Sequence, residues 1–171
     1  MKRISILIMV TMLVFSANAF AKMGVLNFQQ VLKQSAAGKD VFNTLQKEAD
    51  EYDKKLKALS SSIKGIQEDY GRQESILGED AKEKKRTEIQ RKIRNFNTLK
   101  EDYAKELKRL EMRHLKKVQD EVMKIVNDLG KELGYEMILE QQNSAVLYRS
   151  KNIDVTDNVI KRYDNVYKQK K

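Results

Sequence analysis

The sequence predicts an α+β protein in which a long antiparallel coiled-coil helical hairpin projects from a small β-rich body. Two observations predict the hairpin. Apolar residues are spaced alternately three and four apart along two long stretches, and a break flanked by glycines separates these stretches at residues 71–80. Such a repeat keeps one stripe of a helix facing a partner helix. The absence of proline from the 171 residues also fits long uninterrupted helices.

The first of the two helices is expected over about residues 36–72, with Ser35 as its N-cap. Its apolar seam keeps the alternating spacing at Phe42, Leu45, Ala49, Tyr52, Leu56, Leu59, Ile63, Ile66 and Tyr70. Because the chain is only 40% hydrophobic, so long a run in one register is not expected by chance. A rod of this kind has no deep pocket, so function is expected to lie in its surface, shape and assembly.

The second helix is expected to begin with Asp80 as its cap. Its seam is read through Ile89, Ile93, Phe96, Lys100, Tyr103, Leu107, Leu110 and His114. The register then slips by one, to Leu115, Val118, Val122, Ile125 and Leu129. A hairpin turning near residue 78 places Phe42 opposite His114, so beyond His114 the second helix must pack against something other than the first. The coiled-coil hairpin is therefore expected to occupy residues 42–114.

The rest of the chain, residues 22–41 and 115–171, is expected to form a discontinuous β-rich body. Residues 23–28 read as a short strand followed by a helical turn through Val31 and Leu32, and residues 135–140 and 145–149 read as the two strands of a β-hairpin. Gly134 is expected to cap the preceding helix, and Thr156 to cap a final short one. So few strands bury too little surface to be stable alone, which predicts that several chains pool their strands in one oligomeric base.

Residues 1–21 have the pattern of a signal peptide cleaved after Ala21. Lys2 and Arg3 precede an apolar run, and small residues follow it. An uncleaved N-terminal anchor is the alternative, although the run is short for a membrane span. Removal of residues 1–21 lowers the net charge from +9 to +7, because they hold two basic and no acidic residues.

The composition excludes several kinds of chemistry. The chain has no cysteine, which removes disulfides, thiolate metal sites and cysteine nucleophiles. Its one histidine, His114, cannot build a metal site or a catalytic triad alone. There is no glycine-rich phosphate loop and no nucleophile motif. We therefore expect no enzyme, no catalytic residue, no metal and no cofactor.

Several segments behind the signal peptide, in this order, resemble the Skp/OmpH family of periplasmic chaperones: residues 25–39, the charged hairpin, and residues 134–140, 145–148 and 153–160. The resemblance implies a homotrimer whose small β-barrel body is shared between three chains. It also implies an ATP-independent holdase that binds unfolded outer-membrane proteins in a cavity between its helical arms. Such a protein would prevent client aggregation in the periplasm, on the way to the outer membrane.

Two sets of residues are expected to carry this function. Client contact is assigned to the apex and to the basic face of the second arm: Ile76, Leu77, Lys82, Lys84, Lys85, Arg86, Arg91, Lys92 and Arg94. The oligomer body is assigned to Val25, Leu26, Phe28, Val31, Leu32, Met137, Leu139, Val146 and Tyr148. Basic arms also favour contact with anionic lipid or lipopolysaccharide. A charge run that merely solvates a helix, with the apolar pair plugging the hairpin turn, would explain the same arm residues.

Two other functions compete with the chaperone. A structural coiled coil that tethers or spaces envelope partners would also need a long rod, although no anchor is visible after cleavage. The sequence pI of about 9.5 suggests nucleic-acid binding. Export and the lack of aromatic residues among the basic ones argue against that reading, so we expect no nucleic-acid partner.

Overall fold

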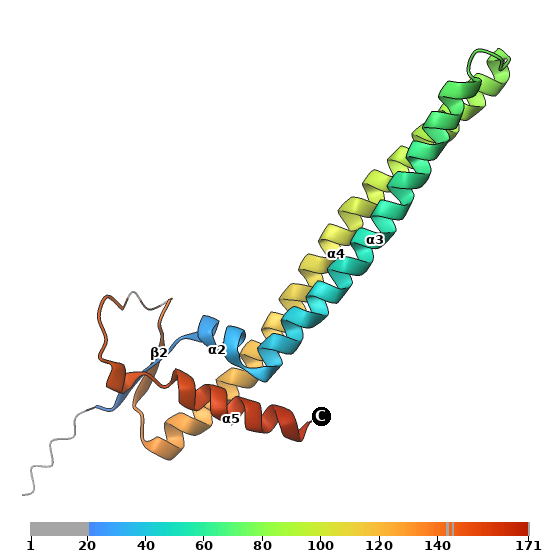
Figure 1. The fold of residues 1–171 in the computed structure, drawn as a ribbon. Coiled ribbons are helices and arrows are strands. Elements are labelled where there is room, and N and C mark those ends of the chain that lie inside the picture. Colours follow the sequence, from blue (N-terminus) through green and yellow to red (C-terminus); the bar gives the residue numbers. More distant parts are fainter. Residues whose placement is uncertain (1–20, 143, 145, 171) are drawn as a thin grey trace, which may run out of the picture.

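The protein is a long two-helix arm standing on a small body (Figure 1). The structure, a computed structural model, describes residues 21–142, 144 and 146–170. The predicted signal peptide therefore lies almost wholly outside the described residues. In chain order the elements are β1 (Met23–Leu26), α2 (Phe28–Gln34), α3 (Ala36–Gln73), α4 (Glu79–Leu133), β2 (Met137–Glu140), the 3₁₀ helix η1 (Lys151–Ile153) and α5 (Thr156–Gln169).

The two arm helices begin and end close to the predicted residues. Ser35 caps α3 as expected, because its side chain accepts a hydrogen bond from the Gly38 backbone N–H at 3.1 Å. The start of α4 differs: Gly78 is the N-cap, and no side chain caps the helix. Asp80 instead lies in the first turn together with Glu79, where negative charge stabilises a helix N-terminus.

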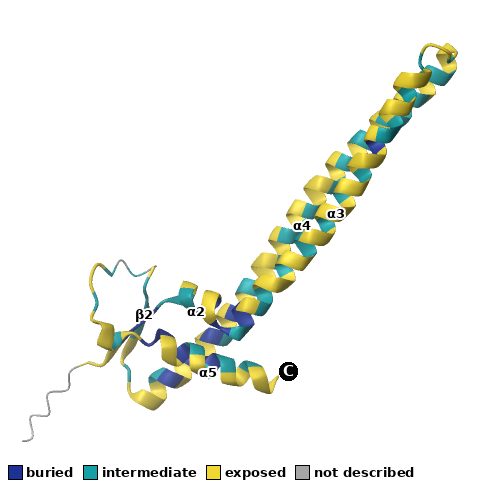
Figure 2. Cartoon of the chain, viewed as in Figure 1, coloured by how far each residue is buried: buried dark blue, intermediate teal, exposed yellow. Residues whose placement is uncertain are grey.

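The apolar seam between the two helices of the arm is only partly buried, since two helices alone bury a single narrow stripe (Figure 2). Beyond the root of α3, Ile63 is its one buried residue among those described. On α4 the prediction that Lys100 is a seam residue is wrong, because Lys100 is exposed and Leu99 is half-buried. Leu99 continues the alternating spacing from Phe96 to Tyr103, so the seam has no charged position there.

The core of the protein lies where α4 enters the body. α4 continues without interruption past His114, and its buried face then packs against α2, the root of α3 and α5. Beyond His114, α4 therefore packs against the body as well as the root of α3. The buried members of the core are Leu26, Val31, Leu32, Ala37, Val118, Val122, Ile125, Val126, Leu129, Val155, Val159 and Tyr163. Gly134 ends α4 in the left-handed conformation, with φ of 67°.

The sheet differs from the expected hairpin. β1 and β2 pair in parallel, with Met23 opposite Met137 and Leu26 opposite Glu140. Residues 146–150 form no strand, and Ala145 lies outside the described residues. The predicted hairpin is therefore wrong within the described chain, and the body has more helix than strand. Since β1 comes from the far N-terminus, no local pattern could reveal its pairing with β2.

Thr156 joins the two ends of the chain rather than capping α5. It is the first residue of that helix, and its hydroxyl accepts a hydrogen bond from the Asn27 backbone N–H at 2.9 Å. Asp154 accepts from the Thr156 backbone N–H at 2.9 Å. Asn27 in turn caps α2 by accepting from the Gln30 backbone N–H. These bonds fasten the start of α5 to the turn between β1 and α2.

Candidate functional site

The basic residues expected to contact clients surround the upper part of α4 rather than forming one stripe. Lys84, Arg91 and Arg94 are exposed, whereas Lys85 and Lys92 are half-buried near the seam. At 3.6 residues per turn, these positions point in different directions around the helix. The fold therefore provides a positively charged arm, not a compact basic patch.

Arg86 is held in a network at the arm tip. Its Nε donates to the Tyr70 hydroxyl at 2.8 Å, and its guanidinium donates to the Glu74 carboxylate at 3.0 Å. The Tyr70 hydroxyl donates to the same Glu74 oxygen at 2.8 Å. Hydrogen bonds from Tyr70 and then Arg86 lower the pKa of Glu74. Arg86 thus joins the two helices just below the turn, a role that the sequence did not reveal.

The two apolar residues at the apex have different environments. Ile76 is 82% exposed, so it does not plug the turn. Leu77 is half-buried, and its backbone N–H donates to the Gln73 carbonyl at 3.1 Å. The arm therefore ends in an exposed isoleucine.

The seam opens at the root of the arm. Phe42, predicted as the first internal seam residue, is 53% exposed. With Leu45 and Ala49 it faces Ala104 and Leu107 across an open groove of about 550 Å³. The placement of Phe42 opposite the register slip was the sequence signal that could have revealed this exposed apolar surface.

The residues assigned to the oligomer body divide into two groups. Val25, Leu26, Val31 and Leu32 are buried inside the chain, so they support the body but present no surface to a second copy. The outward group is more exposed: Phe28, Leu139 and Val146 are half-buried, and Met137 and Tyr148 are exposed. The prediction omitted further exposed apolar residues of the body, among them Met123 and Leu147.

An apolar groove follows β2 on the body surface. Its volume is about 440 Å³, and its apolar lining comes from Leu26, Phe28, Val122, Met123, Val126, Ile138 and Leu139. β2 has β1 as its one strand neighbour, so its other edge has no partner strand among the described residues. An unpaired edge beside an apolar groove is a surface that another strand could extend.

The described part of the chain shows no site for metal chemistry and no membrane helix. No three histidine, cysteine, aspartate or glutamate side chains gather there in a metal-binding arrangement. His114 is half-buried at the arm root, where it lines a hollow of about 140 Å³ with Asp40 and Glu121. None of the described helices has the length and apolar content needed to span a membrane.

Comparisons with known proteins agree with this architecture. The model of the family described as outer membrane protein (OmpH-like) matches residues 22–163. A Skp-like protein of Pseudomonas aeruginosa is 26% identical over 169 residues, covering 97% of this chain and 99% of that protein. The crystal structure of an OmpH-like outer membrane chaperone from Caulobacter crescentus superposes with a TM-score of 0.81 at 17% identity, covering 88% of each chain. Because the family model spans both the arm and most of the body, the chain belongs to the Skp/OmpH family.

Proposed function

We propose that the protein is an ATP-independent holdase chaperone that binds unfolded outer-membrane proteins between its helical arms. The observation that carries the proposal is the arm itself, long and charged, with its apolar seam only half-covered. Family membership and the chaperone named among the similar structures support the same role. The alternative of a structural tether between envelope partners rests on the length of the rod.

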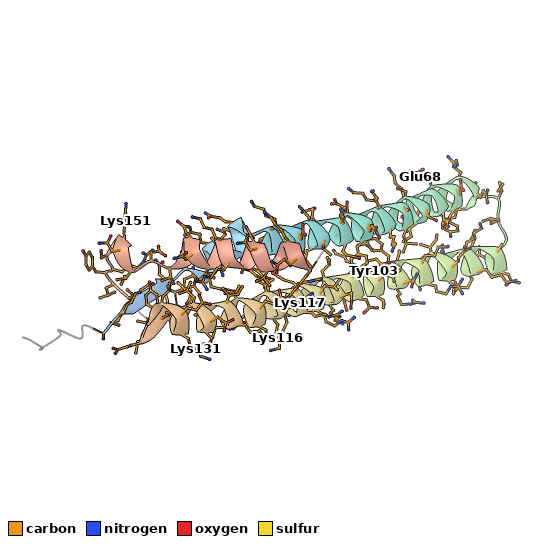
Figure 3. The ribbon with its side chains drawn as sticks, turned by 90° about the horizontal axis from the view of Figure 1, so that it is seen from below. Glu68, Tyr103, Lys116, Lys117, Lys131 and Lys151 are labelled. Carbon is orange, nitrogen blue, oxygen red and sulfur yellow. The ribbon has the colours of Figure 1, made fainter. Side chains whose placement is uncertain are left out.

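The chemistry of the arms suits a client without fixed structure. An unfolded β-barrel chain exposes alternating apolar side chains and unpaired strand edges, which drive aggregation. Exposed Ile76 and Phe42 offer apolar contacts at the two ends of the arm, and long lysine and arginine side chains lie between them (Figure 3). Many weak contacts of this kind delay aggregation by mass action and need no nucleotide.

The proposed assembly is a homotrimer whose bodies complete one β-barrel. The unpaired edge of β2 and the groove beside it support this proposal. Leu147 is fully exposed and Tyr148 is 88% exposed, and both lie on the segment that follows β2. Large apolar side chains of this kind are depleted from the surfaces of monomers unless a partner covers them.

The proposed compartment is the periplasm, reached after cleavage at Ala21. There the basic arms would also meet anionic lipid or lipopolysaccharide. Nucleic acid is not a proposed partner.

The holdase is tested by diluting a urea-unfolded outer-membrane barrel into buffer with the mature protein and no nucleotide. We expect the light scattering of the client to stay low at a molar excess of the protein. A tether would leave the scattering as high as that of the client diluted alone, and that result would overturn the holdase proposal.

The assembly is tested separately by measuring the mass of the mature protein in solution. The variant Leu147→Ser with Tyr148→Ser should lose the trimer mass, whereas Ile76→Ser, at the distant arm tip, should keep it. A concentration-independent monomer for the unaltered chain would reject the shared body and leave the holdase test unaffected.

A further inference from the structure

The coiled-coil seam between the two helices of the arm is open just above its root, where a groove lies beside Phe42, although Ala37 of α3 and Val118 of α4 share the core of the body below it. Phe42 should be a seam residue, yet it is 53% exposed beside the open groove. Val41 and His114 are half-buried, and the seam register of α4 slips directly after His114. Knobs-into-holes packing needs a regular 3.5-residue repeat on both helices, so at this level α3 and α4 are joined by the core of the body and by contacts with α5 instead.

The C-terminal half of α5 contacts both helices at this place. The Tyr163 hydroxyl donates to Glu121 of α4 at 2.8 Å, and the Lys170 ammonium donates to the other oxygen of that carboxylate at 2.9 Å. The Tyr167 hydroxyl donates to Asp40 of α3 at 2.9 Å. Figure 1 shows α5 crossing the lower part of α4, with its C-terminal end on the side of the arm root.

The two tyrosine contacts are partly sheltered from water, whereas the Lys170–Glu121 contact is exposed. Tyr163 is 1% exposed, and its ring lies 6.3 Å from that of Tyr167. Burial alone would raise the pKa of Glu121, but hydrogen bonds from Lys170 and Tyr163 outweigh it and lower the pKa. Burial, followed by the bond to Glu121, raises the pKa of Tyr163. The carboxylate thus stays ionised and the phenol neutral near neutral pH, so the bond from Tyr163 to Glu121 is charge-assisted.

We propose that α5 is a clasp that sets the separation of the two arm helices at their root. Asp40 and Glu121 are the positioning residues, one on each helix, through which α5 holds α3 beside α4. Release of the clasp lets α3 move away from α4 and widens the groove at Phe42. The inference concerns the arm of a single chain, so it stands whether or not the chain binds clients.

The clasp is tested by measuring the distance between α3 and α4 just above the root. The sequence has no cysteine, so Lys47→Cys and Lys105→Cys on the exposed faces of the two arm helices accept spin labels without a competing thiol. Labelled chains are diluted with unlabelled ones, which limits signals between copies. Pulsed electron paramagnetic resonance then gives the distance distribution without any client.

Glu121→Gln combined with Asp40→Asn should shift the distribution to longer distances and broaden it. Tyr167→Phe, which removes one hydroxyl and keeps the ring, should broaden it less. Glu132→Gln is the matched control. The Glu132 carboxylate accepts a hydrogen bond from the Arg162 guanidinium of α5 at 2.6 Å, but this bond joins α5 to α4 and not to α3. An unchanged distribution in both clasp variants, or equal broadening in the control, would overturn the proposal.

Discussion

Tyr52 of α3 and Tyr103 of α4 stack face to face across the arm, with ring centroids 4.2 Å apart and ring planes 2° apart. Both residues lie on the half-buried seam, and Figure 3 shows Tyr103 between the two helices. Burial, followed by the nearby charge of Glu48, raises the pKa of Tyr52. The pair therefore works as a packing contact between the two helices in the lower third of the arm.

Replacing both stacked tyrosines should reveal their coupling. A double-mutant cycle of Tyr52→Leu and Tyr103→Leu should give an interaction free energy of about 0.5–1.5 kcal/mol, typical of an aromatic pair. Urea unfolding followed by circular dichroism measures it. Tyr52→Leu with Tyr135→Leu is the control, because Tyr135 follows α4 in the body, and these two changes should add. An interaction free energy of zero in the first cycle would show that the stacked tyrosines do not stabilise the packing of α3 against α4.

Gly38 allows α2 and α3 to approach each other. A Cβ at this position would lie 1.9 Å from the Leu32 carbonyl oxygen, so Gly38→Ala must push the two helices apart. We expect the free energy of unfolding to fall by about 1–3 kcal/mol, as for other overpacked sites. Gly65→Ala is the control, because nothing lies within 4 Å of that position in the middle of α3. It should stabilise the protein by about 0.5–1 kcal/mol, and a loss of stability at both positions would contradict the steric explanation.

Thr156→Val should weaken the junction between the two ends of the chain. The substitution keeps the shape of a buried side chain but leaves the Asn27 backbone N–H without its acceptor. The expected loss is about 1–3 kcal/mol in the free energy of unfolding, measured by chemical denaturation. Thr156→Ser retains the hydroxyl and should cost less. If the two variants were equally unstable, lost packing rather than the lost acceptor would be the cause.

Glu121 should make stability depend on acid. Its pKa lies below the ordinary 4.5 in the folded chain, so the unfolded chain binds more protons in that range. The contribution of Glu121 is therefore present above pH 4.5 and is lost as the pH falls through the folded pKa. When the free energy of unfolding is measured from pH 7 to pH 3, the values for Glu121→Gln and for the unaltered chain should converge at the acid end. A constant difference across this range would contradict the role of the ionised carboxylate.

Charge reversal on the upper arm should weaken client capture in a salt-dependent way. Changing Lys84, Lys85, Arg91 and Lys92 to Glu should reduce capture more at low salt than at high salt, because salt screens exposed charges. Co-sedimentation with an unfolded barrel client measures the effect. Reversal of Lys116, Lys117, Lys124 and Lys131 alters the net charge equally but in the lower half of α4, so it should reduce capture less. Equal losses at both salt concentrations would indicate packing rather than charge.

The arm was predictable because its signals are local. The alternating spacing, the Ser35 cap and the glycine at the end of α4 each act over one or two turns, and the structure has all three. The seam position predicted at Lys100 was wrong by one residue, because Leu99 keeps the alternating spacing after Phe96. The sequence also predicted a change of packing at His114, because a break in register is visible without knowing the partner.

By itself, the sequence determined that this protein has a long two-helix arm, where the arm turns, and where it enters a body. Only the tertiary structure decided that β1 pairs in parallel with β2 and that Phe42 is exposed to solvent. It also decided that α5 donates hydrogen bonds to Asp40 and Glu121. The physical reason is distance along the chain. Helix periodicity is set by neighbours a few residues apart, whereas the Asn27–Thr156 bond joins residues 129 positions apart. Which surfaces meet over such separations depends on the packing of the whole body, and no local repeat encodes it.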